Sequence, residues 1–123
     1  MSEHCSLTDK SCRPCEGSIP PLGDAKVEEL FTELKGWELI SKELVKTFTF
    51  KNFYETIAFT NAVAWIANSE DHHPDLEISY KTCTVHYSTH AINGLSENDF
   101  ICAAKIDALI PAKPDSGAMC RPA

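Results

Sequence analysis

The chain has 123 residues, 43% of them hydrophobic, and a formal net charge of −7. This length suits one domain with a real core. Because the chain is acidic and has no run of Lys or Arg, we expect no direct contact with nucleic acid, for which a basic patch is typical. The N-terminus lacks the pattern of a secretory signal, and no apolar stretch approaches the length of a membrane span. We therefore expect a soluble, cytoplasmic protein without a membrane segment.

The two ends of the chain differ in composition from the middle. Residues 1–23 are rich in Ser, Pro and Gly without any periodicity, and they are predicted to form a flexible arm. Residues 111–123 are predicted to be a disordered tail. The folded domain is expected over residues 24–110.

Six cysteines are expected to be reduced thiols, because a chain of this size can form a core without disulfides. Cys83 and Cys102 lie in apolar-patterned segments and are predicted to be buried. Cys12 and Cys15 form one C-x-x-C in the arm, downstream of Cys5. A small metal site there is conceivable, but a solvated, oxidisable segment is the favoured interpretation.

The first predicted elements are a helix and two strands. A helix is expected to follow Asp24, with its apolar residues at i, i+3, i+4 and i+7, and to end at Gly36. Strands are predicted over Trp37–Ile40 and Val45–Phe50, joined by a short link. The alternation in the second strand places Phe48 and Phe50 on one face.

A second helix is predicted to begin after Asn52, with Glu55 three residues later in a capping-box pattern, and to end near Ser69. Its apolar stripe is wide enough to contact a partner subunit as well as the sheet. The members of that stripe are Phe53, Ile57, Phe59, Ala62, Val63, Trp65 and Ile66.

Two half-buried strands are expected over Leu76–Tyr80 and Cys83–Ser88, since apolar and polar residues alternate in both. Asn93-Gly94 predicts a turn. A third helix, capped by Ser96, is expected to run through Leu109. The predicted fold is thus α+β, with order α-β-β-α-β-β-α and the helices on one face of an antiparallel sheet. The other face is left to solvent or to an oligomer contact.

Histidines cluster in Asp71-His72-His73-Pro74 and in Ser88-Thr89-His90. Histidine is the side chain whose ordinary pKa suits proton transfer near neutral pH. The doublet follows a helix C-terminus and Asp71, and both favour a protonated imidazole. If the preceding strand continues, His90 projects from its polar face. A polar loop without chemistry is the alternative; a zinc site is disfavoured, because no H-x-x-x-H or nearby C-x-x-C supports it.

These motifs and their spacing resemble the pterin-4a-carbinolamine dehydratases, in particular the bacterial members. The resemblance covers Asp24 to Leu109 and rests on His72-His73-Pro74, Tyr80, His90 and Asp99. Gly36-Trp37 and Gly94-Leu95-Ser96-Glu97 also match. The chain departs from the family at Asn68, where many members carry a charged residue.

The resemblance implies an antiparallel four-stranded sheet with three helices, and a homodimer or homotetramer. It implies a dehydratase that converts 4a-hydroxytetrahydrobiopterin to quinonoid dihydropterin and water, without metal or organic cofactor, in tetrahydrobiopterin recycling for phenylalanine hydroxylase. Its catalytic residues would be His72, His73 and His90, with His73 and His90 as the acid–base pair. The residues expected to bind the pterin are Asp71, Ser88, Thr89, Trp37 and Asp99, although Trp37 could be structural and Asp99 could serve as a helix cap.

Two other functions fit the sequence. The same fold could act as a non-enzymatic dimerisation adaptor for a transcription factor, which would need a helix surface and not the histidines. The cysteines of the arm could alternatively make a small metal-binding protein.

Overall fold

The computed structural model describes residues 7–12 and 20–110. Three α-helices and four antiparallel strands alternate in the predicted order, which confirms the α+β fold class. In chain order the elements are α1 (Asp24–Phe31), β1 (Glu38–Ile40), β2 (Glu43–Thr49), α2 (Phe53–Glu70), β3 (Asp75–Ile78), β4 (Thr82–Tyr87) and α3 (Glu97–Asp107). Two short 3₁₀ turns, Leu7–Asp9 and His90–Ile92, accompany them.

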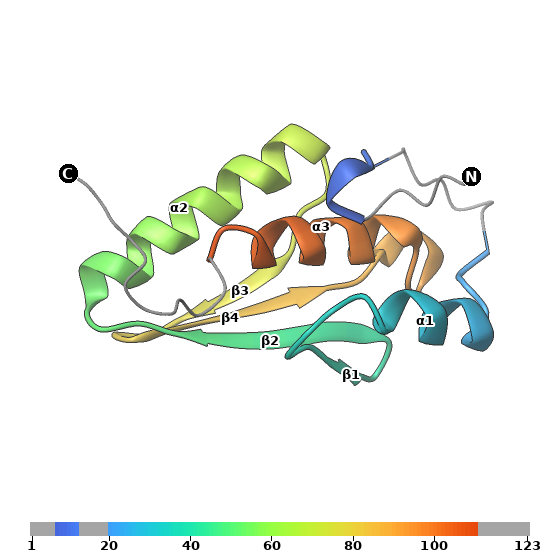
Figure 1. Ribbon diagram of the computed structural model, residues 1–123, viewed down its shortest axis with the longest axis horizontal. Helices are drawn as coiled ribbons and strands as arrows, with labels where there is room; N and C mark the ends of the chain where they lie inside the picture. The colour runs from blue at the N-terminus through green and yellow to red at the C-terminus, as the bar shows by residue number, and fades with distance from the viewer. Residues whose placement is uncertain (1–6, 13–19, 111–123) are drawn as a thin grey trace.

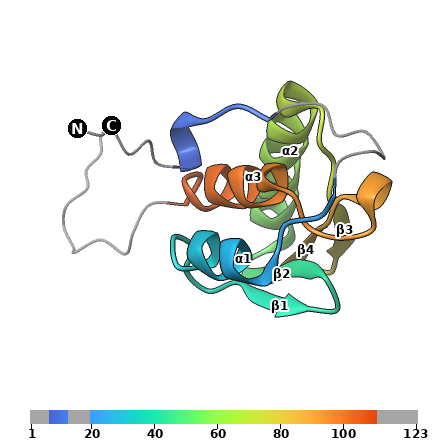
Figure 2. The ribbon, with the colours of Figure 1, turned by 90° about the vertical axis from the view of Figure 1, so that its right-hand side faces the viewer.

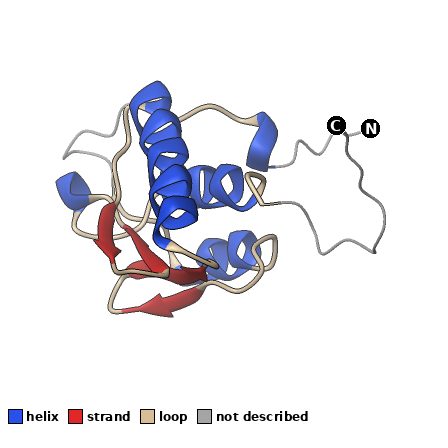
Figure 3. Ribbon diagram, turned by 90° about the vertical axis from the view of Figure 1, so that its left-hand side faces the viewer, coloured by secondary structure: helices blue, strands red, loops and turns tan. Residues whose placement is uncertain are grey.

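The four strands form one sheet in the order β1-β2-β4-β3. All three α-helices lie on the same side of it (Figure 1), and Figure 3 shows the strands as a separate layer beneath the helices. The side chains that point toward the helices are buried in the core, among them Leu44, Phe48, Cys83, Val85 and Tyr87. The opposite face is polar and carries Thr47, Thr84 and His86.

Local signals fix where several elements begin. The Asn52 side chain accepts a hydrogen bond from the Glu55 backbone N–H at 2.9 Å, which confirms the predicted cap of α2. The Ser96 backbone N–H donates to the Asp99 carboxylate at 2.9 Å at the start of α3. Ser41 and Lys42 both have positive φ, so a two-residue turn of type I′ joins β1 to β2.

Some boundaries differ from the prediction. α1 ends at Phe31 and not at Gly36, because backbone bonds from Glu33 and Leu34 reach back only three residues and tighten the chain into a turn. Gly36, with φ of +83°, lies in the connection to β1. β4 ends at Tyr87, and α3 ends at Asp107 before Leu109 is reached.

The structure also differs from the predicted flexible arm. Leu7 is 2% exposed and belongs to the core cluster, and Lys10 bonds Glu97 of α3 at 2.7 Å. Figure 2 shows this segment, in blue, beside α3. The arm therefore supplies part of the core through residues 7–12. Residues 1–6 and 13–19 of the arm and the tail 111–123 lie outside the described residues.

Within the part of the chain that the structure describes, no helix is both long enough and apolar enough to cross a membrane.

Candidate active site

A cavity of about 610 Å³ lies where the end of α2, the end of β4 and the start of α3 meet. Three of the five histidines of the chain line it, together with neighbours from the two predicted motifs. The predicted site residues that line it are Asp71, His72, His73, Ser88, Thr89 and His90. Two motifs separated along the chain thus form one pocket.

The turn that aims the doublet at this pocket is set by Asp71. It caps α2 in the left-handed conformation, with φ of 54° and ψ of 43°. The His72 backbone N–H then donates to the Ala67 carbonyl at 3.0 Å. A left-handed residue at this position is the usual way to end a helix and to satisfy its last carbonyls. The chain leaves the helix sharply, and Pro74 follows in the link to β3.

His72 is held by a buried carboxylate. Its Nε2 lies 2.6 Å from Oδ1 of Asp99, whose side chain is fully buried. The other oxygen of Asp99 accepts from the Thr89 hydroxyl at 2.7 Å and from the Ser96 backbone N–H at 2.9 Å. The carboxylate is therefore shared between the helix cap and the histidine. These three bonds leave Asp99 behind His72 and outside the pocket lining.

This contact controls the charge of His72. Burial by itself lowers the pKa of His72, but the hydrogen bond and negative charge of Asp99 outweigh it, with smaller contributions from Cys102 and Asp71. The pKa is raised above its ordinary value of 6.5. The cationic form of His72 is thus more favoured than in a free histidine, and in that form Nε2 donates to Asp99 and only Nδ1 remains for another partner.

Tyr87 fixes the imidazole from a second direction. Its ring stacks on that of His72 with the centroids 5.3 Å apart and an interplanar angle of 11°. Its hydroxyl donates to the His72 carbonyl at 3.1 Å. Since Tyr87 is fully buried on β4, both the ring and the backbone of His72 are tied to the sheet.

His73 and His90 are both exposed and reach the pocket from two different segments. His73 follows α2, whereas His90 begins the 3₁₀ turn after β4. The strand does not continue as far as His90, so the condition under which His90 would project from its polar face is not met. A bridge between Thr89 and Gly94, with the Thr89 N–H donating to Gly94 at 2.9 Å, closes the loop that carries His90.

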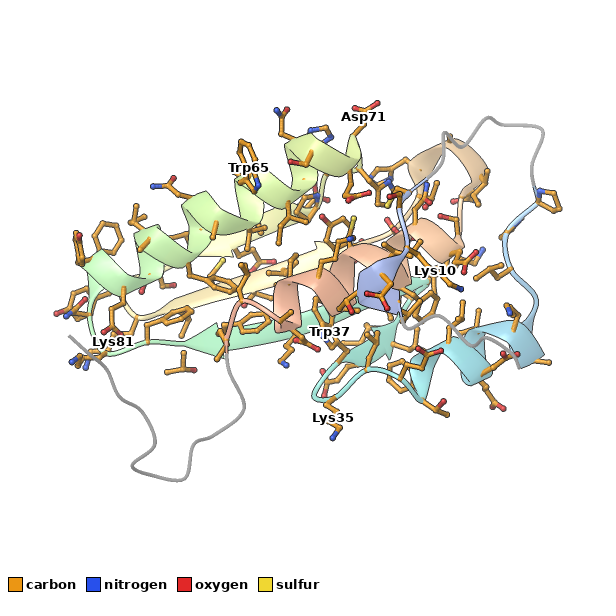
Figure 4. All side chains as sticks on the ribbon, turned by 45° about the horizontal axis from the view of Figure 1, so that its top comes forward. Lys10, Lys35, Trp37, Trp65, Asp71 and Lys81 are labelled. Atoms are coloured by element: carbon orange, nitrogen blue, oxygen red, sulfur yellow. The ribbon has the colours of Figure 1, made fainter. Side chains whose placement is uncertain are left out.

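Trp37, which was predicted to bind the pterin, lies elsewhere. Trp37 is 5% exposed, and its indole N–H donates to Asp107 at the far end of α3, at 3.0 Å. Figure 4 shows Trp37 well apart from Asp71. Trp37 consequently does not line this pocket, and its contacts are structural. His86, expected to be only a polar-face residue, lies on the open side of the sheet between Glu43 and Glu77.

Residues not predicted for the site complete its wall. Cys12 lines the pocket, and its backbone N–H donates to Glu70 at 2.8 Å. Glu70 and Asn98 line the pocket too. Nothing local in the sequence signals these contacts, because Cys12 and Glu70 are 58 residues apart. Among residues 7–12 and 20–110, no three His, Cys, Asp or Glu side chains are grouped so as to hold a metal ion.

Comparisons with known proteins agree on one family. Residues 20–109 match the family described as Pterin 4 alpha carbinolamine dehydratase. A relative from Nitrosomonas eutropha is 54% identical over 111 residues, which cover 89% of this chain and 98% of the relative. Another, from Nitrosospira multiformis, is 57% identical over 103 residues, 84% of this chain and 91% of the relative. Both carry the name pterin-4-alpha-carbinolamine dehydratase as a provisional assignment.

A solved structure has the same fold. The protein from Brucella melitensis, described as a transcriptional coactivator/pterin dehydratase, superposes with a TM-score of 0.69 at 30% identity. The match covers 72% of this chain and 97% of that protein.

Proposed function

Because the chain belongs to the pterin-4a-carbinolamine dehydratase family, we propose that it dehydrates 4a-hydroxytetrahydrobiopterin to quinonoid dihydropterin and water. The observation that carries this proposal is the convergence of His72, His73 and His90 on one pocket. In a cell this activity would serve tetrahydrobiopterin recycling beside phenylalanine hydroxylase.

The reaction needs two proton transfers. Loss of the 4a-hydroxyl requires a proton on the departing oxygen. The new double bond in the pterin ring forms when a ring nitrogen gives up a proton. An acid and a base placed on two sides of the pocket can perform both transfers, and each contributes roughly 10²–10⁴-fold. His73 and His90 suit these roles because both are exposed, and they come from separate segments.

His72 has a different role in this proposal. Since Nε2 is engaged by Asp99, it is less free to exchange a proton than the two exposed histidines. We assign it to binding, as a cation that Asp99 and Tyr87 hold at the pocket wall. Asp71, Ser88 and Thr89 also line the pocket and are proposed to contact or orient the pterin.

The test is turnover of chemically generated carbinolamine by the full chain and by single variants. His73→Ala and His90→Ala should each lower kcat/KM by about 100-fold or more, because each removes a proton-transfer group. His86→Ala is the matched control, since it removes a histidine on the open face of the sheet, and it should leave kcat/KM near that of the unchanged protein. Full activity in both pocket variants would refute the acid–base assignment.

A second candidate function is protein binding through α2. Trp65 is 72% exposed and Tyr54 is 83% exposed, and Figure 4 shows Trp65 pointing away from the body of the protein. Large exposed aromatic side chains on one helix are typical of an interface. The description of the Brucella protein as a coactivator agrees with an adaptor role. The same surface is proposed to form the homodimer or homotetramer.

Sedimentation velocity separates these roles. We expect the unchanged protein to be an oligomer at micromolar concentration and Trp65→Asp to dissociate toward the monomer. His73→Ala should lose turnover but keep the oligomer. A chain that is oligomeric yet shows no turnover in any form would favour the adaptor over the enzyme.

A further inference from the structure

Two cysteines from opposite ends of the chain meet beside the pocket. Sγ of Cys12 lies 3.5 Å from Sγ of Cys102, although 90 positions separate them in the sequence. Cys102 is fully buried on α3, whereas Cys12 is half-buried and lines the pocket. One sulfur is thus accessible from the cavity, and its neighbour lies directly behind it.

This proximity is fixed by contacts of Cys12 itself and of the residues that precede it. Its backbone N–H donates to Glu70 at 2.8 Å, and its Sγ lies 3.7 Å from the Asn98 carbonyl. Upstream, Leu7 is buried in the core, and Lys10 bonds Glu97 at 2.7 Å. The segment is therefore anchored to α2 and α3, and the packing of the fold holds the two sulfurs close together.

The surroundings also activate one sulfur. The Cys12 thiol, as hydrogen-bond donor, lowers the pKa of Cys102, and the Tyr87 hydroxyl and the charge of His72 add to this effect against the opposing effect of burial. The same pairing, together with burial, raises the pKa of Cys12. Of the two, Cys102 is therefore the thiol that is more readily deprotonated, and the thiolate is the form that reacts with oxidants.

We propose that Cys12 and Cys102 are a redox modification site, at which a peroxide forms an intramolecular disulfide between the arm and α3. The first sulfur breaks the O–O bond of hydrogen peroxide, becomes a sulfenic acid and releases one water. The second sulfur displaces the hydroxyl group, which leaves as a second water, and the S–S bond forms. Two thiols lose two protons and two electrons, and one peroxide becomes two waters.

The disulfide would act on the arm and on the pocket wall. It closes a long loop between residues 12 and 102, which restricts the unfolded chain and holds the arm against α3. The sulfurs need to approach from 3.5 Å to about 2.05 Å. Cys12, which is half-buried and follows the exposed Ser11, has more room for this movement than the fully buried Cys102. The oxidised protein keeps Cys12 fixed at the edge of the pocket.

The experiment uses the full chain with Cys5, Cys15 and Cys120 changed to Ser, and the unchanged chain beside it. Each is treated with stoichiometric hydrogen peroxide, alkylated and digested without reduction. We expect a peptide pair that joins Cys12 to Cys102, and a free Cys83. Cys83 is the internal control, because it is fully buried and its sulfur accepts a hydrogen bond from the Thr60 hydroxyl at 3.6 Å.

Thermal unfolding gives an independent measurement. Oxidation should raise Tm by on the order of 5 °C, and dithiothreitol should reverse the change. Cys12→Ser should show neither the linked peptide nor the shift. Sulfinic acid on Cys102 without a link, or a Cys12–Cys15 link in the unchanged chain, would overturn the proposal. Neither result would bear on the dehydratase proposal, because turnover there depends on the histidines.

Discussion

The helix-covered side and the open side of the sheet each carry a histidine paired with a carboxylate. His72 lies 2.6 Å from Asp99 on the covered side, and His86 lies 2.7 Å from Glu77 on the open side. The distances are nearly equal, but the surroundings are opposite. The Asp99 side chain is fully buried, whereas that of Glu77 is 72% exposed.

Burial decides what each pair can do. Water and salt screen the open pair, so its contribution to stability is small. The covered pair is removed from water, and its carboxylate also holds Thr89 and the N-terminus of α3. Removing one partner of the covered pair leaves buried polar groups without a hydrogen-bond partner or an opposite charge, which destabilises the fold. A histidine and a carboxylate therefore form a fixed, buried contact on one side of the sheet and an adjustable surface contact on the other.

The largest expected difference between the two sides follows the removal of the carboxylate. Asp99→Ala should cost about 3–5 kcal/mol of the free energy of unfolding, because His72, Thr89 and the Ser96 N–H all lose their acceptor. Glu77→Ala is the counterpart on the open face, and it should change the free energy of unfolding by no more than about 0.5 kcal/mol. Urea unfolding of both variants measures this. Equal losses would mean that burial does not separate the two pairs.

Apolar packing should show a smaller contrast of the same kind. Leu7→Ala should cost about 2 kcal/mol, because this side chain is 2% exposed within the core cluster. Ile40→Ala is the matched change on the open side, where the side chain is 48% exposed, and should cost under about 1 kcal/mol. Thermal or urea unfolding compares them. A negligible loss for Leu7→Ala would mean that the arm is dispensable for the fold.

Local sequence patterns correctly predicted most of the fold. The Asn52 cap, the Ser96–Asp99 cap and the alternation of Cys83 and its neighbours are signals within a few residues, and each predicted the correct element. The end of α1 was missed because short backbone hydrogen bonds from Glu33 and Leu34, and not a glycine, set it. The predicted residues of the two histidine motifs do line one pocket, but their individual roles remain predictions.

Long-range contacts could not be predicted from these patterns. The contact between His72 and Asp99 spans 27 positions, and that between Cys12 and Cys102 spans 90. Asp99 has the local appearance of a cap and gives no sign of its second partner. Trp37 looked like a ring-binding residue, but its partner Asp107 lies 70 positions away. Only the packing of α3 against the sheet brings these groups together.

The pH dependence of stability sharpens the comparison through His72 alone. Because folding raises the pKa of His72, its contribution is complete below the unfolded pKa of about 6.5 and is lost as pH rises through the higher folded value. The free energy of unfolding that the His72→Gln change removes should therefore be greatest below about pH 6.5 and should become smaller toward alkaline pH. Urea unfolding across this range tests it, and a loss that grows with pH would contradict the raised pKa.

The smallest expected effect is the coupling of the open-face pair, and a double-mutant cycle measures it. His86→Gln, Glu77→Gln and the double variant should give a coupling of about 0.2–1 kcal/mol. Glu43 also lies 3.1 Å from Nδ1 of His86, so loss of Glu77 leaves His86 with a second carboxylate. High salt should reduce the coupling further, because both carboxylates reach solvent. The equivalent cycle on His72 and Asp99 should give a larger value that salt changes little. If the open pair coupled as strongly as the covered pair, its carboxylates would have to be shielded from water in solution, as they would be if a second subunit covered this face.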